Sequence, residues 1–475
     1  MALPGFNLPG LGIRSTSTPQ VTGTSAPDVE QPSRREELAP QSEWRFEAGF
    51  IQSYSVRLVS GHAELFGVEL AQNQTHNLSG LKGAVFTWQG CELEVIGEAE
   101  SEYSAQETEY ATEWINLHGM LESARDGASE GPRVLVVGPD STGKSSMVRS
   151  LAAWAVRQGR APTVVHLDPR EGLLAPPSSL TAVTIVSQME VDGWGISPMT
   201  GPSLQPVRSP LVYHFPYATP SERPNAFKAI VTRSALTTLN KLEEDPLAKQ
   251  SGIIIDTPGG LNDPKSNYDM IHHIISEFSI NLVVALGSER LYNDLNRRYT
   301  SKSPEDAIAV LKLAKPGGAV ERDNAYMKQL RARQVRQYFF GSKESLNPHS
   351  HSIPTNDLTI YRAKPASSDA ALPSFGAEDE DDYDPAATST SSSNTMYEKV
   401  APSLAMTGAL IAIKFCSSNS EEATIRDSAI MGYLYVADVD EARKKVRFLA
   451  PHPQRWGDRA LVWGTWPEAA ADLVR

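Results

Sequence analysis

One short stretch restricts the folds open to this chain more than any other. An apolar run, Val134–Val137, leads directly into Gly138-Pro139-Asp140-Ser141-Thr142-Gly143-Lys144-Ser145-Ser146, and a helical pattern follows. The spacing is G-x-x-x-x-G-K-S, which in the order strand, loop, helix is the signature of a phosphate-binding loop (P-loop). The alternative is a glycine-rich turn that matches by chance. The sequence therefore predicts an α/β domain with a parallel sheet around this loop.

The residue types in the loop suit phosphate chemistry. Backbone N–H groups turn inward around a phosphate, and the first turn of the following helix adds unpaired N–H groups and a positive dipole end. Gly143 lets the backbone approach closely, Lys144 reaches the β- and γ-phosphates, and the Ser145 hydroxyl takes a Mg²⁺ position. The predicted ligands are thus ATP and Mg²⁺. The predicted nucleotide contacts from the loop are Gly138, Ser141, Thr142, Gly143, Lys144, Ser145 and Ser146.

The region around the loop, residues 110–345, has the alternating texture of an α/β domain. Its β-branched apolar runs predict buried strands, and longer amphipathic stretches separate them. The expected strands are Arg133–Val137, Thr163–His166, Gly252–Ile255 and Asn281–Leu286, and the expected helices are Tyr110–Arg125, Lys144–Gln158 and Phe227–Lys241.

The flanking regions predict two further domains, in line with about three domains for 475 residues. Residues 1–40 are rich in Pro, Ser, Thr and Gly and predict a disordered tail. Residues 41–109 contain short alternating strands, typical of a β-sandwich. Residues 346–475 predict a smaller mixed domain. Its stretch 366–394, rich in Ser, Ala, Asp and Glu, predicts a disordered insert.

Two carboxylates end predicted strands beside the loop. Asp168 follows Val164–Leu167, and Asp256 follows Ile253–Ile255. Ligands of open α/β sheets bind at the carboxyl ends of strands, so one of these residues can hold Mg²⁺ through water and the other can accept a proton or orient the acceptor. Turn or capping roles are the alternative. We take Asp168 as the candidate metal ligand and catalytic residue.

Two further patterns leave alternatives open. Asp256-Thr257-Pro258-Gly259 resembles the D-x-x-G element of GTPases, but the only string close to a guanine-reading N-K-x-D, Asn240-Lys241-Leu242-Glu243, comes earlier and lacks the Asp. The Arg-bearing stretch Ser288–Arg298 follows a strand, so it either closes over the γ-phosphate or forms a solvated helix face.

Composition excludes some classes of protein. No run approaches the roughly 18 apolar residues of a membrane-spanning helix, and the N-terminus lacks the apolar core of a secretory signal. The two cysteines, Cys91 and Cys416, are too few for a disulfide framework and favour the cytosol or nucleus. A net charge of −13 argues against broad coating of nucleic acid.

Short strings across the chain carry a resemblance. Besides the P-loop, these strings are Glu64-Leu65-Phe66-Gly67, Gly131-Pro132-Arg133-Val134, Pro210-Leu211-Val212-Tyr213-His214-Phe215, Glu289-Arg290-Leu291-Tyr292, Gly318-Ala319-Val320-Glu321-Arg322 and Gln337-Tyr338-Phe339-Phe340-Gly341. In their order and spacing the chain resembles the polynucleotide 5′-hydroxyl kinase family, and within it the fungal subunits of the pre-mRNA cleavage and polyadenylation machinery.

The resemblance implies an N-terminal β-sandwich that reaches the nucleotide, a central P-loop domain and a C-terminal domain. It also implies two nucleotide contacts from the sandwich, Glu43 beside Trp44 and Lys82 before an aromatic strand. Composition alone does not single out either residue. The implied setting is the nucleus, with other cleavage-factor subunits as partners, RNA contacted weakly or indirectly, and no membrane.

In the family that the chain resembles, active members phosphorylate the 5′-hydroxyl of RNA, whereas fungal members bind ATP without that activity and act as scaffolds. This sequence departs from the active pattern in two places. Asp168 is followed by Pro169-Arg170-Glu171-Gly172 rather than Val-Gly-Gln-Gly, and the clasp from Thr219-Pro220 to Asn225 is longer than in active members. The resemblance therefore predicts an ATP-binding structural subunit, with an active RNA 5′-kinase as the alternative.

Overall fold

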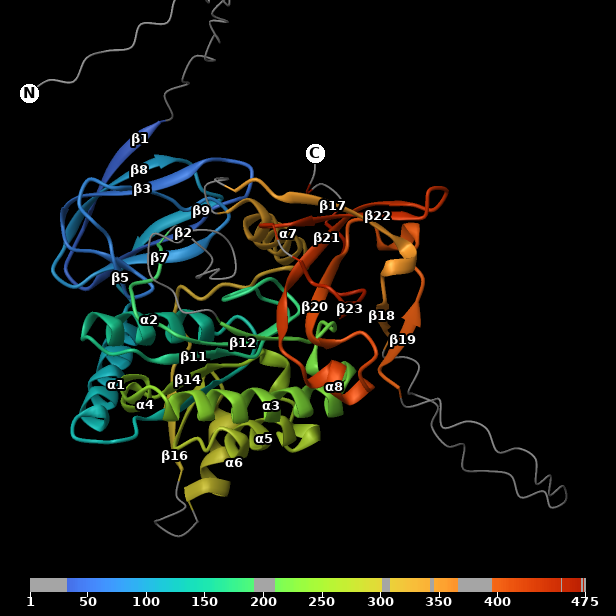
Figure 1. Ribbon diagram of the computed structural model, residues 1–475. Coiled ribbons are helices and arrows are strands. Elements are labelled where there is room, and N and C mark those ends of the chain that lie inside the picture. Colours follow the sequence, from blue (N-terminus) through green and yellow to red (C-terminus); the bar gives the residue numbers. More distant parts are fainter. Residues whose placement is uncertain are drawn as a thin grey trace, which may run out of the picture.

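The computed structural model describes residues 32–191, 210–300, 308–341, 346–365, 395–453, 455–470 and 473. These residues form an N-terminal β-sandwich, a central α/β domain and a C-terminal β domain (Figure 1). The predicted class of fold is therefore confirmed. The predicted insert 366–394 lies outside the described residues, and no helix among those described is both long and apolar enough to cross a membrane.

Two sheets form the N-terminal sandwich. Side chains alternate along its strands, so that Tyr54, Val56 and Leu58 of β3 point inward and are almost fully buried. The first sheet has the order β1 (Ser33–Leu38), β8 (Cys91–Gly97), β3 (Tyr54–Gly61), β6 (Thr75–Asn77), and the second β5 (Val68–Glu69), β4 (Glu64–Leu65), β7 (Lys82–Thr87), β2 (Ser42–Glu47), β9 (Ser101–Ala105).

Strand β1 corrects the predicted tail at residues 1–40. All six residues from Ser33 to Leu38 pair with β8, and Leu38 is buried. The strand escaped prediction because its sequence, SRREEL, has one apolar residue and four charged ones. Charged side chains are common on edge strands, where they discourage pairing with other chains.

The central sheet is mixed, whereas the sequence predicted a parallel sheet. Five strands run parallel to their neighbours, but β12 pairs antiparallel with β11 and with β13. The predicted strands are all present; β12, β13 and β16 are additions at the two edges. The order is β13 (Leu211–His214), β12 (Ser179–Thr184), β11 (Thr163–His166), β14 (Ile253–Asp256), β10 (Arg133–Val137), β15 (Leu282–Leu286), β16 (Ala309–Leu313).

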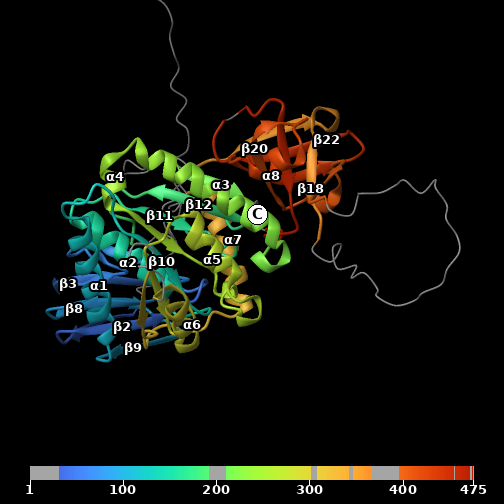
Figure 2. The ribbon, with the colours of Figure 1, turned by 90° about the horizontal axis from the view of Figure 1, so that it is seen from below.

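Helices cover both faces of this sheet (Figures 1 and 2). Strand β10 shows why: Val134 and Val136 face a core shared with α1 and α2, whereas Leu135 and Val137 face a core shared with α3, α5 and α6. The helices are α1 (Glu109–Arg125), α2 (Lys144–Arg157), α3 (Pro224–Glu243), α4 (Pro246–Ser251), α5 (Asp269–Glu277) and α6 (Glu289–Thr300).

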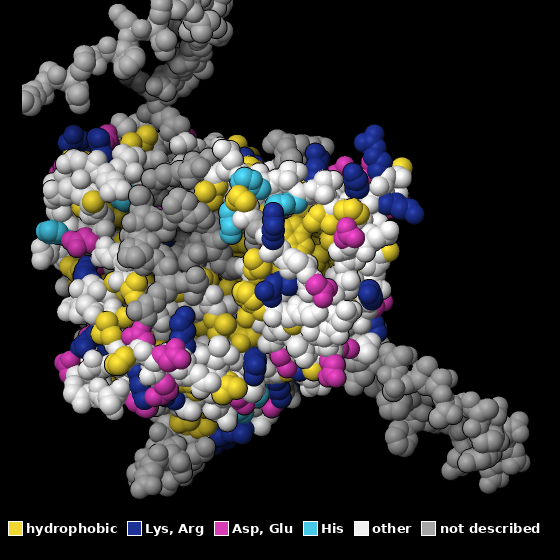
Figure 3. Space-filling model, in the orientation of Figure 1, with side chains coloured by type: hydrophobic (Ala, Val, Ile, Leu, Met, Phe, Trp, Pro, Cys, Tyr) yellow, Lys and Arg dark blue, Asp and Glu magenta, His cyan; other side chains and the backbone are white. Residues whose placement is uncertain are grey.

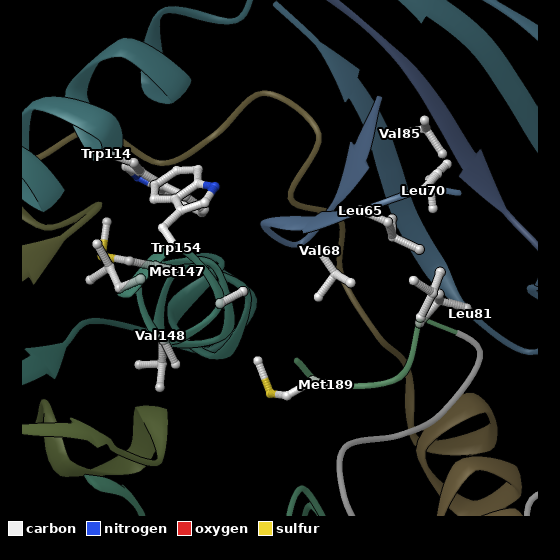
Figure 4. Packing of buried hydrophobic residues seen from close by; sticks show 14 of the residues in the cluster. Leu65, Val68, Leu70, Leu81, Val85, Trp114, Met147, Val148, Trp154 and Met189 are labelled. Carbon is white, nitrogen blue, oxygen red and sulfur yellow. The ribbon is translucent and has the colours of Figure 1, made fainter. Parts of the chain in front are cut away.

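The core on the α1 and α2 side continues into the sandwich. Figure 4 shows Val68 of the sandwich pointing toward helix α2, with Leu65, Leu70 and Leu81 lying together behind it. Gly67 lies so close to α2 that an added Cβ would lie 2.8 Å from the Cα and the carbonyl oxygen of Ser150. The sandwich is therefore seated on the helix that follows the P-loop.

A second seven-stranded sheet forms the C-terminal domain, and α7 (Asn324–Phe340) joins it to the central domain. Tyr338 and Phe339 of α7 pack against Tyr433 and Tyr435, and a β-bridge links Tyr213 to Ala429. Helix α8 (Glu422–Asp427) packs near α3. The order is β17 (His349–Pro354), β22 (Lys445–Ala450), β21 (Ile430–Asp440), β20 (Leu410–Ser417), β23 (Arg459–Trp463), β18 (Ile360–Ala363), β19 (Tyr397–Val400).

Candidate nucleotide-binding site

The P-loop has the backbone that its sequence predicts. Strand β10 ends at Val137, and helix α2 begins at Lys144. Gly143 precedes the helix with φ +89°, a left-handed conformation that favours glycine. At Gly138 an added Cβ would lie 2.3 Å from the carbonyl oxygen of Leu286. Both glycines are thus required by the path of the loop between strand and helix.

Lys144 is held inside the loop. Its side chain is buried, and Nζ donates to the carbonyl oxygen of Pro139 at 2.7 Å. Burial lowers the pKa of Lys144, and the carboxylates of Asp256 and Asp140 oppose that shift. The ammonium is therefore pre-positioned within the loop, where a phosphate would replace the water that burial removes.

A cavity opens between the P-loop, the sandwich and the segment 316–326. Besides the P-loop residues, its walls include Lys82 and Phe66 from the sandwich, Tyr110 from α1, and Pro316 and Arg322 from the segment. Such a space at the carboxyl ends of parallel strands is the usual ligand site of an open α/β sheet.

Most of the predicted nucleotide contacts line this cavity. Six belong to the loop and two lie beyond it. They are Ser141, Thr142, Gly143, Lys144, Ser145, Ser146, Lys82 and Asp168. Lys82 is already engaged there: its Nζ donates to Glu47 Oε2 at 2.6 Å and lies 5.1 Å from the centre of the Tyr326 ring.

Two of the predicted contacts do not line the cavity. Glu43 has no exposed surface; Oε1 lies 2.5 Å from Arg45 Nε, and Oε2 accepts a hydrogen bond from Tyr110. Tyr110 therefore stands between Glu43 and the cavity. Gly138 sits at the base of the loop, where its carbonyl accepts a hydrogen bond from Asn262. Contact with a nucleotide stays a prediction for all of the predicted contact residues, and Glu43 and Gly138 lie outside the cavity lining.

An arginine binds two carboxylates of the site, Asp140 within the P-loop and Asp168 just after the end of β11. Arg170 donates to Asp168 through Nε at 3.1 Å and Nη2 at 2.9 Å, and through Nη2 to Asp140 Oδ1 at 2.6 Å. Burial opposes the charge on Arg170, but Asp168 and Asp140 raise its pKa above the ordinary value. Asp168, the candidate metal ligand, is thus already neutralised by a cation of the chain itself.

A buried network lies behind this pair. His166 Nδ1 lies 3.1 Å from Asp256 Oδ2, and Nε2 lies 3.1 Å from the carbonyl oxygen of Glu171. Burial opposes protonation of His166, but Asp256 raises its pKa to about 9, so both ring nitrogens donate. Burial likewise opposes ionisation of Glu171, but the ion pair with Arg322 lowers its pKa to about 2. The turn after β11 is therefore fixed by paired charges.

The structure also shows where the two patterns with open alternatives lie, the Arg-bearing stretch and the GTPase-like string. The stretch Ser288–Arg298 forms α6, where the Arg290 side chain is 73% exposed and lies near Asp294 on the same helix. This position favours the solvated helix face. Residues Asn240–Glu243 lie within α3, not in a loop after a strand, which disfavours guanine recognition. Asn225 lies in the first turn of α3, outside the cavity lining.

Sequence reasoning missed several residues of the cavity. Arg149, Trp114 and Tyr326 line it, yet only Arg149 is close to a motif, five residues after Lys144 on the same helix. Trp114 was expected only as part of a helical apolar face. Tyr326 comes from α7 and had no local signal, because its role depends on how the chain returns to the P-loop.

This fold and this loop define a P-loop nucleotide-binding protein with an added β-sandwich. Sequence models of one family match three successive parts of the chain: its N-terminal beta-sandwich domain at residues 37–128, its P-loop at 138–341, and the remaining pre-mRNA cleavage complex II part at 346–468. The chain belongs to the mRNA cleavage and polyadenylation factor CLP1 family.

Curated relatives agree over the whole length. A factor of this name from Phaeosphaeria nodorum is 44% identical over 483 aligned residues and covers 100% of both chains. One from Botryotinia fuckeliana is 42% identical and covers 99% of this chain and 100% of its own. The resemblance to fungal cleavage and polyadenylation factors, inferred from the sequence, is therefore confirmed.

Two solved structures share the fold. A Clp1p–Pcf11p complex has a TM-score of 0.80 at 24% identity and covers 92% of this chain and 98% of that chain. A second, on an extended Pcf11p–Clp1p interface and ATP loss in a glycine-to-arginine mutant, has a TM-score of 0.81 at 24% identity, with 92% and 99% covered.

Proposed function

We propose that this chain is an ATP-binding, non-catalytic subunit of the nuclear complex that cleaves and polyadenylates the 3′ ends of pre-mRNA. Membership of the family supports the process, and the P-loop supports nucleotide binding. The observation that carries the non-catalytic part is the contact of Arg170 with both Asp168 and Asp140.

The residues of the loop fit a triphosphate. Gly143 and the first turn of α2 offer N–H groups, and Lys144 is a buried cation that needs an anion beside it. Ser145 lines the cavity and suits Mg²⁺, which would arrive with the nucleotide and neutralise part of the phosphate charge. Asp168 fits a metal less well, because Arg170 already occupies its two oxygens; an indirect contact through water remains the proposal.

Catalysis needs contacts that become stronger in the transition state, whereas a loop that only cradles phosphates holds the ground state equally well. In this chain both carboxylate oxygens of Asp168 are already engaged by Arg170. The Glu171–Arg322 pair fixes the adjoining turn. These features support binding without turnover, and they disfavour the alternative of an active RNA 5′-hydroxyl kinase.

ATP then serves as a structural ligand. Lys82 and Phe66 of the sandwich line the same cavity as the P-loop, so a bound nucleotide would contact both domains. A ligand that binds only the assembled state stabilises it by mass action. Such a protein suits a scaffold for other subunits, and the solved relatives of this fold are complexes with Pcf11p, a partner we extend to this chain.

RNA is not the main partner in this proposal. On the face drawn in Figure 3, Lys and Arg side chains are scattered, and Asp and Glu side chains lie among them. A net charge of −13 gives no broad attraction to a phosphate backbone. Contact with RNA through other subunits is the simpler expectation, and a nuclear location follows from the process.

The deciding experiment is a turnover assay with 5′-hydroxyl RNA and labelled ATP on the purified chain. We expect intact ATP to be recovered from the protein, a rise in melting temperature with added ATP, and no labelled RNA above background. Steady release of 5′-phosphorylated RNA that Asp168→Asn abolishes would establish the kinase instead.

A further inference from the structure

Arg149 is a buried cation that has no anion beside it in the described part of the chain. It lies in the second turn of α2, five residues after Lys144, and is 5% exposed. Its Nε is buried and has no acceptor, and among the described residues the guanidinium forms neither an ion pair nor a hydrogen bond. The guanidinium lies over an aromatic ring instead: Cζ lies 4.4 Å from the centre of the Phe66 ring. The residue lines the cavity beside the P-loop.

This situation is energetically unusual. A buried charge is normally paired, because removal from water costs more than a cation–π contact returns. Burial alone lowers the pKa of Arg149 to about 10, with no carboxylate opposing it. Of the two arginines that line this cavity in the described part of the chain, Arg322 binds Glu171. Arg149 is therefore the cavity arginine that has no anionic partner among the residues the structure describes.

The position on α2 indicates what that partner is. Helical side chains lean toward the N-terminus of their helix, so Arg149 covers the turn that contains Ser145 and Ser146. Lys144 is the residue of a P-loop that reaches the β- and γ-phosphates, whereas the backbone of this turn meets the α-phosphate. A full positive charge also favours an anionic group over a neutral base or sugar.

We propose that Arg149 donates hydrogen bonds to the α-phosphate of the bound nucleotide while its guanidinium lies on Phe66. The inference rests on the proposed binding of ATP and adds a phosphate contact outside the P-loop motif. The contact also links the nucleotide to the sandwich, because Arg149 would touch both the phosphate and Phe66. Phe66 precedes Gly67, which packs on Ser150 of α2. Binding would thereby hold the sandwich and the helix together.

The test is calorimetry of Arg149→Met with ATP, ADP and AMP. Because all three ligands carry the α-phosphate, we expect about a 10- to 100-fold loss of affinity for each one. The melting temperature of the nucleotide-free protein is expected to stay the same or rise, because an unpaired buried charge has been removed. Arg149→Gln, which is also uncharged, provides a second variant if the first fails to fold.

Arg157→Met is the matched control. Arg157 lies on the same helix and faces the sandwich, but it pairs with Glu64 and Glu69 at 3.8 and 3.7 Å and does not line the cavity. We expect it to leave nucleotide affinity within about two-fold of the wild type, as is usual for a partly exposed ion pair.

Two results would overturn the proposal. The first is unchanged nucleotide affinity in the Arg149 variants; if the melting temperature falls at the same time, Arg149 only supports the packing of Phe66. The second is a loss of affinity confined to ATP, which would place Arg149 at the γ-phosphate. Phosphorylation of RNA by the wild-type protein would refute the proposed function but leave this contact standing.

Discussion

Arg170 donates two hydrogen bonds to Asp168, from Nε to Oδ1 at 3.1 Å and from Nη2 to Oδ2 at 2.9 Å. The same Nη2 lies 2.6 Å from Asp140 Oδ1 in the P-loop. One guanidinium thus balances two carboxylates beside the place where a triphosphate would add further negative charge. Paired, charge-assisted contacts of this kind are among the stronger ones in proteins.

This arrangement makes a prediction about Mg²⁺. With Arg170 in place, we expect ATP affinity to fall only modestly when Mg²⁺ is chelated. In Arg170→Gln, Asp168 and Asp140 would repel the triphosphate unless the metal is present, so the affinity is expected to fall by about ten-fold or more on chelation. Calorimetry with and without EDTA measures the ATP affinity of the wild type and of Arg170→Gln. Equal dependence on Mg²⁺ in the two proteins would show that Arg170 does not offset this charge.

A second prediction concerns the P-loop lysine. Lys144→Ala removes the buried ammonium that Pro139 holds at 2.7 Å, and we expect ATP affinity to fall by about ten- to a hundred-fold. Lys241→Ala, an exposed lysine in the last turn of α3, is the control and is expected to bind ATP normally. Unchanged ATP affinity in a folded Lys144→Ala protein would show that the loop is not part of the nucleotide-binding site.

The sequence alone was enough for the parts of this fold that rest on local pattern. Strand β10, Gly143 and Lys144 form one continuous motif, so loop and helix were predicted together and confirmed. Strand β1 was missed because pairing to β8, and not its own apolar content, holds it in the sheet. Strand β12 is buried throughout, but its antiparallel direction is decided by the turn after β11.

The candidate site shows the same division. Residues in the motif were found by spacing, and Lys82 only through the resemblance; Ser141–Ser146 and Lys82 all line the cavity. Arg149 and Tyr326 were missed, because their place in the cavity depends on the contact with Phe66 and on the path of α7. Glu43 was carried over from the family, but here Tyr110 and Arg45 bind its carboxylate, which spacing cannot reveal.

The corrected boundary at the N-terminus gives a third prediction. We expect removal of residues 1–31 to leave the melting temperature unchanged, as their composition predicts. Removal of residues 1–38 is expected to lower it, because β8 loses one of its two partner strands and the sandwich loses the buried Leu38. A loss of about 2 kcal/mol from Leu38 would shift the transition by about 4 to 8 °C. Equal melting temperatures for the two deletions would show that β1 adds nothing to stability.

The last prediction is a pH dependence that belongs to Lys414 in the C-terminal domain. Lys414 has no exposed surface, and its Nζ donates to the carbonyl oxygens of Ser428 at 3.0 Å and Arg426 at 3.3 Å. Burial lowers its pKa from 10.5 to about 7, an effect that Cys416 and Asp427 only partly oppose. His214, from the central domain, faces the same charge, and burial together with Lys414 lowers its pKa well below the ordinary value.

The sign of the effect follows from where the proton is held. Between about pH 7 and pH 10.5 the unfolded chain keeps the Lys414 proton and the folded protein releases it, so this group makes stability rise with pH. Below about pH 7 both states are protonated, and its contribution is flat. One proton sets an upper limit of about 1.4 kcal/mol per pH unit. Lys414→Met is expected to abolish that rise, so the stability difference between wild type and variant should move in favour of the wild type from pH 7 to pH 9.5. Urea denaturation across this range measures it, and a difference that does not change with pH would mean that Lys414 stays charged in the folded protein.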